Sequence, residues 1–304
     1  MRVVIAGATG FIGRALCESL HQDYEVVALS RNSEKAERSI GHLARVVQWD
    51  GRSTGGWTGE VEDALGVVNL AGESVASGRW TGSKKFRILQ SRLDAAKAIA
   101  GAVKKAERRP KVLVQASAIG YYGRQRDELL DESSPGGEGY LAGVCRGVES
   151  IADTVKGSGA RLAVVRTGIV LGPDGGALAE LVKPFRFHLG GYLGDGRQWF
   201  SWISLKDEVS AIRFLIENES SHGVFNLTAP EPVTMERLCK SVGAILGRRT
   251  WLAVPGYLAR LAFGEKADEM LLSSLKVAPK RLLEAGFEFE HSDIEDALKV
   301  AIEG

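Results

Sequence analysis

The sequence RVVIAGATGFIG, residues 2–13, decides the fold of this chain. A short apolar run predicts a β-strand, glycines follow at every third position, and helical spacing begins directly after them. Gly7 permits a sharp turn, Gly10 lets backbone amides approach an anion, and Gly13 allows the helix to pack close to the strand. The pattern predicts a dinucleotide whose pyrophosphate rests on the helix N-terminus. The residues expected to bind it here are Gly7, Thr9, Gly10, Phe11, Ile12 and Gly13.

Short runs rich in Val, Ile and Leu alternate with amphipathic helical stretches as far as about Gly172. This alternation is typical of a parallel sheet with helices on both faces, because each parallel strand needs a crossover connection. The fold class is therefore α/β, a doubly wound parallel sheet of Rossmann type. The predicted strands are Arg2–Ala6, Tyr24–Ser30, Arg45–Trp49, Gly66–Leu70, Lys111–Ser117 and Arg161–Thr167, and the helices among them are Ile12–His21, Phe86–Ala106 and Leu141–Val155.

The pattern changes after Leu171, where a glycine-rich stretch is interrupted by aromatic residues. We interpret residues 173–249 as a substrate-side cap with connecting elements. Segments from 200–230 are expected to pack on the dinucleotide-binding domain, residues 1–172. Residues 250–304 are predicted to form a smaller, mostly helical C-terminal domain. The helical segments expected from Thr234 onward are Met235–Leu246, Gly256–Phe263, Met270–Val277 and Asp293–Ile302.

The composition indicates which partners to expect. The 39 Lys and Arg residues nearly balance the 38 Asp and Glu residues, which argues against nucleic acid or a membrane surface as a partner. A basic patch at a sheet edge remains the alternative for nucleic acid. The longest apolar runs are strand-sized, and the three cysteines lack metal-ligand spacing. We expect a cytoplasmic protein without a metal site, and its oligomeric state stays open.

The residue after the second predicted strand indicates which dinucleotide binds. Sites that prefer NAD usually place an acidic residue there, about 20 residues beyond the glycines, to bind the ribose hydroxyl. This chain has Arg31 at that place, followed by Asn32. Because a guanidinium pairs bidentately with a 2′-phosphate, we predict that the cofactor is NADP(H) and that Arg31 and Asn32 bind it. The alternative is that Arg31 is a solvated loop residue.

The GxxGxxG spacing of the first turn resembles that of the extended and atypical short-chain dehydrogenase/reductases. Asn69-Leu70-Ala71-Gly72 is similar to the family's NxAG element. The resemblance implies that Leu70, Ala71 and Gly72 line the adenine and ribose. Without the resemblance, Ala71 and Gly72 could simply end a strand in a turn.

Further motifs resemble an atypical subgroup of NAD(P)-dependent epimerase/dehydratase-like proteins, labelled "epimerase family", that have a small C-terminal domain of unknown function. The resemblance implies that Arg92 faces the cofactor and that Ile169 lies near the nicotinamide. The residues alone also allow a solvated Arg92 and a core Ile169. The motifs are Arg79-Trp80-Thr81, Ser91-Arg92, Asp131-Glu132, Ser134-Pro135-Gly136-Gly137, Lys276-Val277-Ala278-Pro279 and Gly286-Phe287.

Candidate catalytic residues follow the fifth predicted strand, which ends at Ser117 and is followed by Tyr121 and Tyr122. The carboxyl ends of parallel strands are the usual ligand-binding edge of such folds. The resemblance carries over to Ser117 the role of polarising the substrate oxygen. Tyr121 or Tyr122 would then form a pocket wall or donate a proton, and the alternative is that both are half-buried packing residues.

The family's Tyr-x-x-x-Lys pair is missing from the helix that should carry it. Tyr140 has no lysine four residues later, and a register based on Glu149 gives Leu141 and Cys145 instead. Arg146 is one residue too far around the helix to replace the lysine. We expect an NADP(H)-dependent oxidoreductase or epimerase-like enzyme with an atypical active site, acting on an unknown small molecule. The alternative is a catalytically weak NADPH-binding regulatory or interaction protein.

Aromatic residues near position 200 carry the only indication of the substrate. Trp199 and Trp202 either wall an apolar or ring-shaped substrate or fill the interface between the sheet domain and the tail. Ser204 and Asp207 have the spacing of a capping box, which favours a structural role for both.

Overall fold

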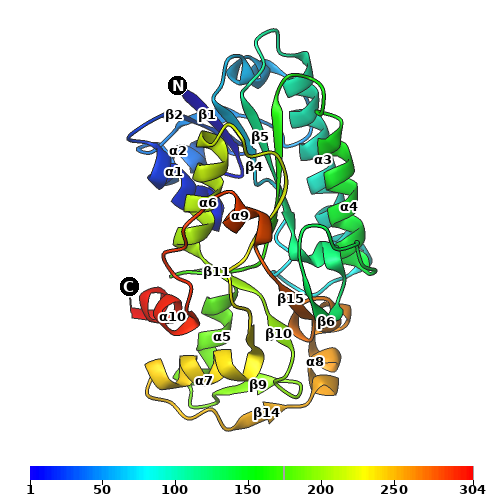
Figure 1. The fold of residues 1–304 in the computed structure, drawn as a ribbon, viewed down its shortest axis with the longest axis vertical. Helices are drawn as coiled ribbons and strands as arrows, with labels where there is room; N and C mark the ends of the chain where they lie inside the picture. Colours follow the sequence, from blue (N-terminus) through cyan, green and yellow to red (C-terminus); the bar gives the residue numbers. More distant parts are fainter. Residues whose placement is uncertain (174, 304) are drawn as a thin grey trace.

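A seven-stranded parallel sheet forms the upper part of the molecule in this computed structural model (Figure 1). The structure describes residues 1–173 and 175–303, and for residues 125–127 it describes the backbone alone. The strand order is β12-β7-β5-β4-β1-β2-β3, which confirms the predicted doubly wound sheet and adds one strand, β12, that was not predicted. The strands are β1 (Arg2–Ala6), β2 (Glu25–Ser30), β3 (Arg45–Gln48), β4 (Gly66–Asn69), β5 (Val112–Ala118), β7 (Arg161–Thr167) and β12 (Gly223–Leu227).

Helices cover both faces of the sheet because alternate strand residues point to opposite sides. Val3 and Ile5 of β1 belong to the core beneath α1 and α6. Val4 and Ala6 belong to the core beneath α3 and α4. Both sets are fully buried, so the apolar run of β1 is explained by its position in the middle of the sheet. The helices are α1 (Phe11–Leu20), α2 (Ser33–Ile40), α3 (Gly82–Lys105), α4 (Tyr140–Asp153) and α6 (Leu205–Glu217), with the short turn η1 (Gly56–Val61).

The lower part of the molecule has a core of its own, to which α5, α7 and α10 contribute (Figure 1). Trp202 lies in this core with none of its surface exposed, and its indole nitrogen donates to the Glu231 carbonyl at 3.1 Å. Trp202 therefore fills the interior. The elements are β8 (Ile169–Leu171), α5 (Gly176–Arg186), β9 (Gly191–Leu193), β10 (Trp199–Phe200), β11 (Trp202–Ser204), β13 (Val233–Thr234), α7 (Met235–Ile245), β14 (Leu252–Val254), α8 (Gly256–Phe263) and α10 (Ile294–Glu303).

The helix predicted over Met270–Val277 is wrong. This segment contains the end of a π-helical turn, η3 (Ala267–Leu271), followed by strand β15 (Ser274–Val277). Strand β15 pairs in parallel with β6 (Gln125–Leu130), which was not predicted either. Leu275 and Val277 alternate with polar residues, as in a strand, and are buried in a small core beside η2 (Ile119–Tyr122). Between this strand and α10 lies one further short helix, α9 (Lys280–Glu284).

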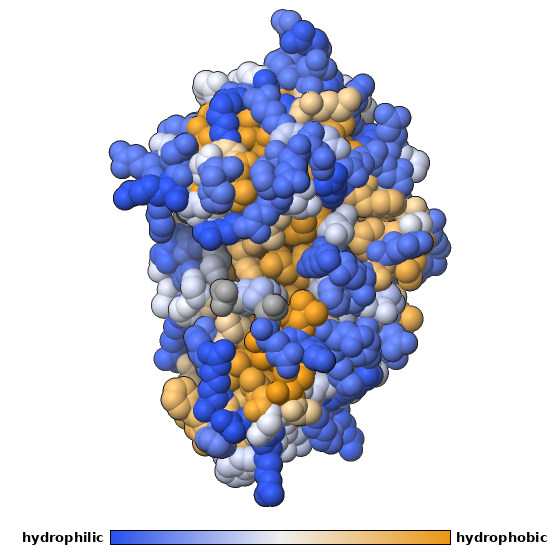
Figure 2. Space-filling view, turned by 90° about the vertical axis from the view of Figure 1, so that its left-hand side faces the viewer, coloured by the Kyte–Doolittle hydropathy of each residue, from blue (hydrophilic) through white to orange (hydrophobic). Residues whose placement is uncertain are grey.

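The polarity of the surface, the length of the helices and the state of the cysteines relate to the expected partners and cellular location. Apolar residues reach the surface in a band across the middle of the face shown in Figure 2, between more hydrophilic regions. Among the described residues, no helix has the length and apolar character needed to cross a membrane. Cys17, Cys145 and Cys239 are buried free thiols. The cytoplasmic location stays a prediction.

Candidate functional site

The turn between β1 and α1 requires glycine at two of its three glycine positions. Gly7 has a φ of +84°, and a Cβ there would lie 2.7 Å from the Leu70 carbonyl. A Cβ on Gly13 would lie 2.2 Å from the Gly7 carbonyl oxygen. Gly10 is the N-cap of α1 and has no side chain to bond the first amides of the helix. Those amides are therefore available to an anion at the positive end of the helix dipole.

Phe11, at the start of α1, packs against the glycine-rich segment that follows β8. A Cβ on Gly172, Gly175 or Gly176 would lie 3.0, 2.5 or 3.1 Å from the Phe11 ring. The absence of side chains in this segment lets its backbone lie directly on the ring. The cofactor turn is thus in contact with the segment that leads into the lower part of the molecule.

Arg31 and Asn32 lie at the end of β2 with different surroundings. Arg31 is exposed, its aliphatic stem runs past Gly51, and its guanidinium has no hydrogen-bond or ion-pair partner in the described part of the chain. Asn32 is the N-cap of α2, because its Oδ1 accepts from the Lys35 amide at 2.9 Å. The Arg31 guanidinium is therefore free to bind a phosphate, whereas the Asn32 side chain is already engaged in capping α2.

A cavity of about 300 Å³ opens at the carboxyl ends of β4, β5 and β7, and we call it the sheet-end cavity. Five of the predicted site residues line it: Leu70, Ala71, Arg92, Ser117 and Ile169. Its walls are mostly apolar, which suits a small organic ligand with a few placed polar groups. Other residues of its lining include Val75, Gln115, Ile119, Leu141, Val144, Cys145, Thr167, Trp199, Glu269, Met270 and Leu275.

Ser117 belongs to a buried polar network behind the cavity. Its hydroxyl donates to Glu149 Oε1 at 2.6 Å, and the two oxygens of Glu149 accept from Arg166 at 3.0 and 2.8 Å. With its only proton directed to Glu149, Ser117 presents acceptor lone pairs to the cavity. Sequence reasoning missed Glu149 and Arg166 as members of the site. The signal was a charged residue inside the apolar strand RLAVVRT.

Tyr121 and Tyr122 lie on the far side of the same network and are not among the residues that line the sheet-end cavity. Arg166 donates to the Tyr122 hydroxyl at 3.0 Å, and that hydroxyl donates to Asn226 Oδ1 at 2.7 Å. Burial raises the pKa of Tyr122 to about 12. The Tyr121 ring stacks on the Arg166 guanidinium, whose carbon lies 3.4 Å from the ring centroid. Both tyrosines therefore hold Arg166 in place.

The face that α4 turns toward the cavity carries Leu141, Val144, Cys145 and Val148. Tyr140 points elsewhere, since its hydroxyl donates to the Lys85 carbonyl at 2.5 Å and its ring packs on Trp80. Desolvation raises the pKa of the Cys145 thiol. The positions of the missing Tyr-x-x-x-Lys pair, in the register based on Glu149, are thus filled by an alkyl side chain and a neutral thiol.

Glu269, from the C-terminal part of the chain, closes the N-terminus of α4. Its carboxylate accepts from the amides of Tyr140 and Leu141 at 3.2 and 3.1 Å, and only 6% of the residue is exposed. Arg124 lies 3.6 Å from the same carboxylate. No local signal in the sequence marks this contact, because it joins two distant segments.

Glu208 on α6 is a second buried carboxyl group close to the cavity. It has no exposed surface, its Oε1 accepts from the Thr167 hydroxyl at 2.8 Å, and its Oε2 has no hydrogen-bond partner in the described structure. Desolvation raises its pKa to about 8. Thr167 itself lines the sheet-end cavity, so Glu208 stands directly behind a cavity residue.

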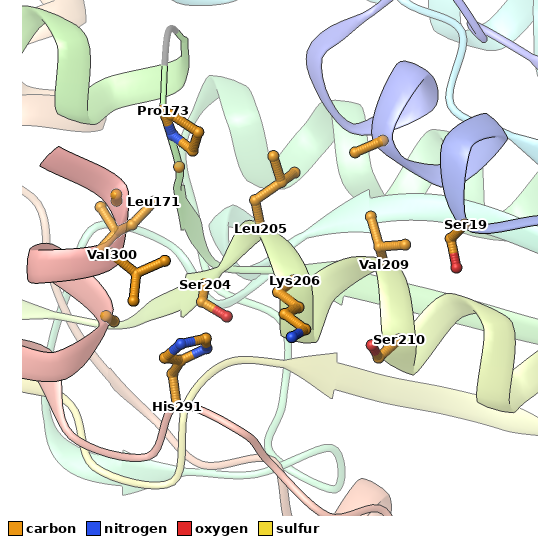
Figure 3. Close-up of a pocket in the computed structure, with 14 residues that line it drawn as sticks. Ser19, Leu171, Pro173, Ser204, Leu205, Lys206, Val209, Ser210, His291 and Val300 are labelled. Carbon is orange, nitrogen blue, oxygen red and sulfur yellow. The ribbon is translucent and has the colours of Figure 1, made fainter. Parts of the chain in front are cut away.

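A second cavity, of about 330 Å³, lies between α1, α6 and α10 (Figure 3). Figure 3 places the His291 imidazole beside Ser204, with Val300 on one side and Val209 on the other. Ser204 is the N-cap of α6, and its hydroxyl donates to Asp207 Oδ2 at 2.7 Å. Because that proton goes to the aspartate and not to the histidine, the three polar residues do not form a nucleophilic triad. Ser204 and Asp207 have the capping role that their spacing indicated.

The fold, the glycine turn and a cavity at the strand ends define a nucleotide-binding protein of the short-chain dehydrogenase/reductase kind. The chain belongs to the NAD dependent epimerase/dehydratase family, whose model matches residues 3–228. Residues 254–301 match a domain of unknown function, DUF1731. These matches confirm the predicted family resemblance.

Proteins similar over their whole length are known from distant organisms. The chain is 39% identical to the Arabidopsis thaliana protein named "Epimerase family protein SDR39U1 homolog, chloroplastic", over 100% of this chain and 87% of that one. It is 38% identical to "Epimerase family protein ML0860" of Mycobacterium leprae, over 98% and 95%. The crystal structure of human epimerase family protein SDR39U1 with NADPH superposes with a TM-score of 0.90, at 33% identity, over 100% of this chain and 99% of that one.

Proposed function

We propose that this protein binds NADP(H) at the turn between β1 and α1 and catalyses an oxidoreduction or an epimerisation of a small molecule in the sheet-end cavity. The observation that carries the proposal is the position of that cavity, at the carboxyl ends of β4, β5 and β7 and beside the Leu70-Ala71 element. The human relative was crystallised with NADPH, in agreement with the cofactor predicted from Arg31.

The residues present fit the cofactor. A side chain on Gly7 or Gly13 would fill the space beside the turn, and the first amides of α1 have no side-chain cap. Arg31 offers an unpaired guanidinium where the 2′-phosphate would lie. When bound, NADPH supplies a hydride, and the protein has to bind, orient and dry the substrate. Ser117 and Thr167 are among the hydroxyl-bearing residues of the cavity. Apolar side chains such as Trp199 exclude water and favour an apolar or ring-shaped substrate.

A second candidate is an NADPH-binding protein with little catalytic activity, whose partner or conformation depends on the cofactor. Leu141 and Cys145 favour it, because neither can replace the proton donor and the cation of the usual pair. The two candidates share the cofactor, and turnover of a substrate distinguishes them.

Calorimetry with NADPH and NADH, followed by NADPH oxidation with a panel of aldehydes, ketones and keto acids, separates the candidates. The enzyme hypothesis is supported if turnover falls in Ser117→Ala and persists in Ser210→Ala. Ser210 is the control because it lines the second cavity and not the sheet-end cavity. Tight NADPH binding without turnover across the panel supports the second candidate. If neither nucleotide binds to the folded protein, both are wrong.

A further inference from the structure

Arg92 is a positively charged residue of the sheet-end cavity without an ion-pair partner among the described residues. Its Nη1 donates to two carbonyl oxygens, of Glu73 at 2.8 Å and of Ile88 at 3.2 Å. Desolvation lowers the pKa of the guanidinium, although it stays charged at neutral pH. A charge removed from water is costly unless it is paired, so proteins usually place a counter-charge beside it. Arg92 is half-buried, and none of the described carboxylates forms an ion pair with it.

The main chain is shaped to accommodate this guanidinium. A Cβ on Gly72 would lie 2.9 Å from the Arg92 Cζ, so any other residue at position 72 would displace the side chain. Arg92 belongs to the long helix α3, and its side chain lies close to Gly72, where a Cβ would also meet its Cγ at 3.0 Å and its Nε at 3.1 Å. Gly72 of the NxAG element therefore makes room for the Arg92 side chain, in addition to the close approach of the cofactor that the family resemblance implies.

The charged groups around Arg92 are satisfied by other partners. The Glu73 carboxylate accepts from Lys84 at 2.8 Å and from Arg87 at 3.2 Å. The Glu269 carboxylate is bound to the first amides of α4. Burial raises the pKa values of Cys145 and Tyr140, so both are neutral near pH 7. Arg92 therefore adds to the cavity a positive charge that makes no ion pair with any described carboxylate, although the charge of Glu73 favours it from a distance.

We propose that Arg92 binds a carboxylate group of the substrate, and that the rest of the substrate is an apolar body held by Leu141, Val144 and Trp199. The proposal rests on the proposed function and names its substrate class. The planar fork of a guanidinium matches the two oxygens of a carboxylate. A phosphate would need further donors, and the amides of α4 that could supply them are occupied by Glu269.

The test measures binding of benzoate and of benzamide, which have nearly the same shape but differ in charge, to the NADP⁺-saturated protein by calorimetry. Wild type is expected to bind benzoate at least ~10-fold tighter than benzamide. Arg92→Met should remove that preference, and Arg92→Lys should retain part of it. Arg87→Met is the matched control on the same helix; its side chain is 54% exposed, and the preference should persist.

Three results would overturn the proposal. The first is that wild type shows no preference for benzoate, and the second is that the preference survives in Arg92→Met. The third is that Arg92→Met loses affinity for NADP⁺ in a parallel titration while the lysine variant keeps benzoate binding unchanged, which would make Arg92 a cofactor residue. If the methionine variant does not fold, the proposal is judged from the preference of wild type for benzoate over benzamide and from the part of that preference that Arg92→Lys retains. Failure of wild type to bind NADP⁺ at all would instead refute the proposed function.

Discussion

Replacing Glu208 by glutamine should make the protein more stable at neutral and alkaline pH. Glu208 is fully buried, and desolvation raises its pKa from 4.5 to about 8. Between these pH values the folded protein keeps a proton on Glu208 that the unfolded chain has released. Stability therefore falls as the pH rises through this window, and it is highest toward the acidic end. Glutamine resembles the protonated carboxyl group and keeps an oxygen for Thr167, but it cannot ionise.

The size of the effect follows from the pKa shift. A difference of one bound proton changes the free energy of unfolding by about 1.4 kcal/mol per pH unit. From pH 5 to pH 8, wild type should lose about 3 kcal/mol that the variant retains, because the difference approaches one proton over most of that interval. Near pH 4.5, where the unfolded chain begins to bind the same proton, the two proteins should have similar stability.

Urea unfolding followed by circular dichroism, at several pH values between 5 and 8, measures this difference directly. The free energy of the Glu208→Gln variant minus that of wild type should rise steadily with pH. Glu180→Gln is the control, since the Glu180 side chain is 72% exposed. Parallel curves for wild type and Glu208→Gln would refute the reasoning, because they would show that Glu208 is already ionised in the folded protein.

Three further changes test the cofactor turn, the cofactor preference and the buried ion pair. Arg31→Glu should weaken NADP(H) binding at least ~10-fold and leave NAD(H) within ~2-fold; equal losses in calorimetry would mean that Arg31 does not contact the phosphate. Gly13→Ala should lower the free energy of unfolding by about 1–3 kcal/mol and abolish tight NADPH binding. Gly101→Ala is the control, because its Cβ would meet nothing closer than 3.9 Å, and it should have neither effect. Glu149→Gln should destabilise the protein by about 3 kcal/mol in thermal unfolding, because it leaves a buried arginine unpaired. Glu180→Gln should stay within ~0.5 kcal/mol of wild type, and a similar loss in both would contradict the argument.

Local sequence patterns predicted the sheet and the cofactor turn. Each strand of the upper sheet is a short apolar run, and the glycines at positions 7 and 13 are required by contacts within the turn or with the adjacent strand end. The predicted strand Arg161–Thr167 agrees with the structure residue by residue. Such features depend on neighbours in the sequence or on burial, and both can be read from residue types.

Contacts between distant segments could not be predicted in the same way. The four residues SLKV of β15 alternate as in a strand, but they are too few to decide between strand and helix, and their extended form depends on the pairing with β6. Likewise, Tyr122 looked like a catalytic residue from its place after β5. Its hydroxyl is instead directed to Asn226, far along the chain, and Glu269 reaches α4 from the C-terminal part.

Serine hydroxyls and main-chain atoms of β15 join the C-terminal segment to the rest of the molecule. Ser201 Oγ donates to the Leu275 carbonyl at 2.7 Å and accepts from the Val277 amide at 2.9 Å, while the Trp199 amide donates to Ser274 Oγ at 3.0 Å. On the side of β15, backbone atoms make two of these bonds and the Ser274 hydroxyl makes the third, so the contacts depend on the alignment of the strand and on serine at positions 201 and 274. A chimera that exchanges this segment between relatives should work only if the spacing from η3 to the end of β15 is kept, whereas its side chains offer a way to alter substrate choice without disturbing the nucleotide-binding half.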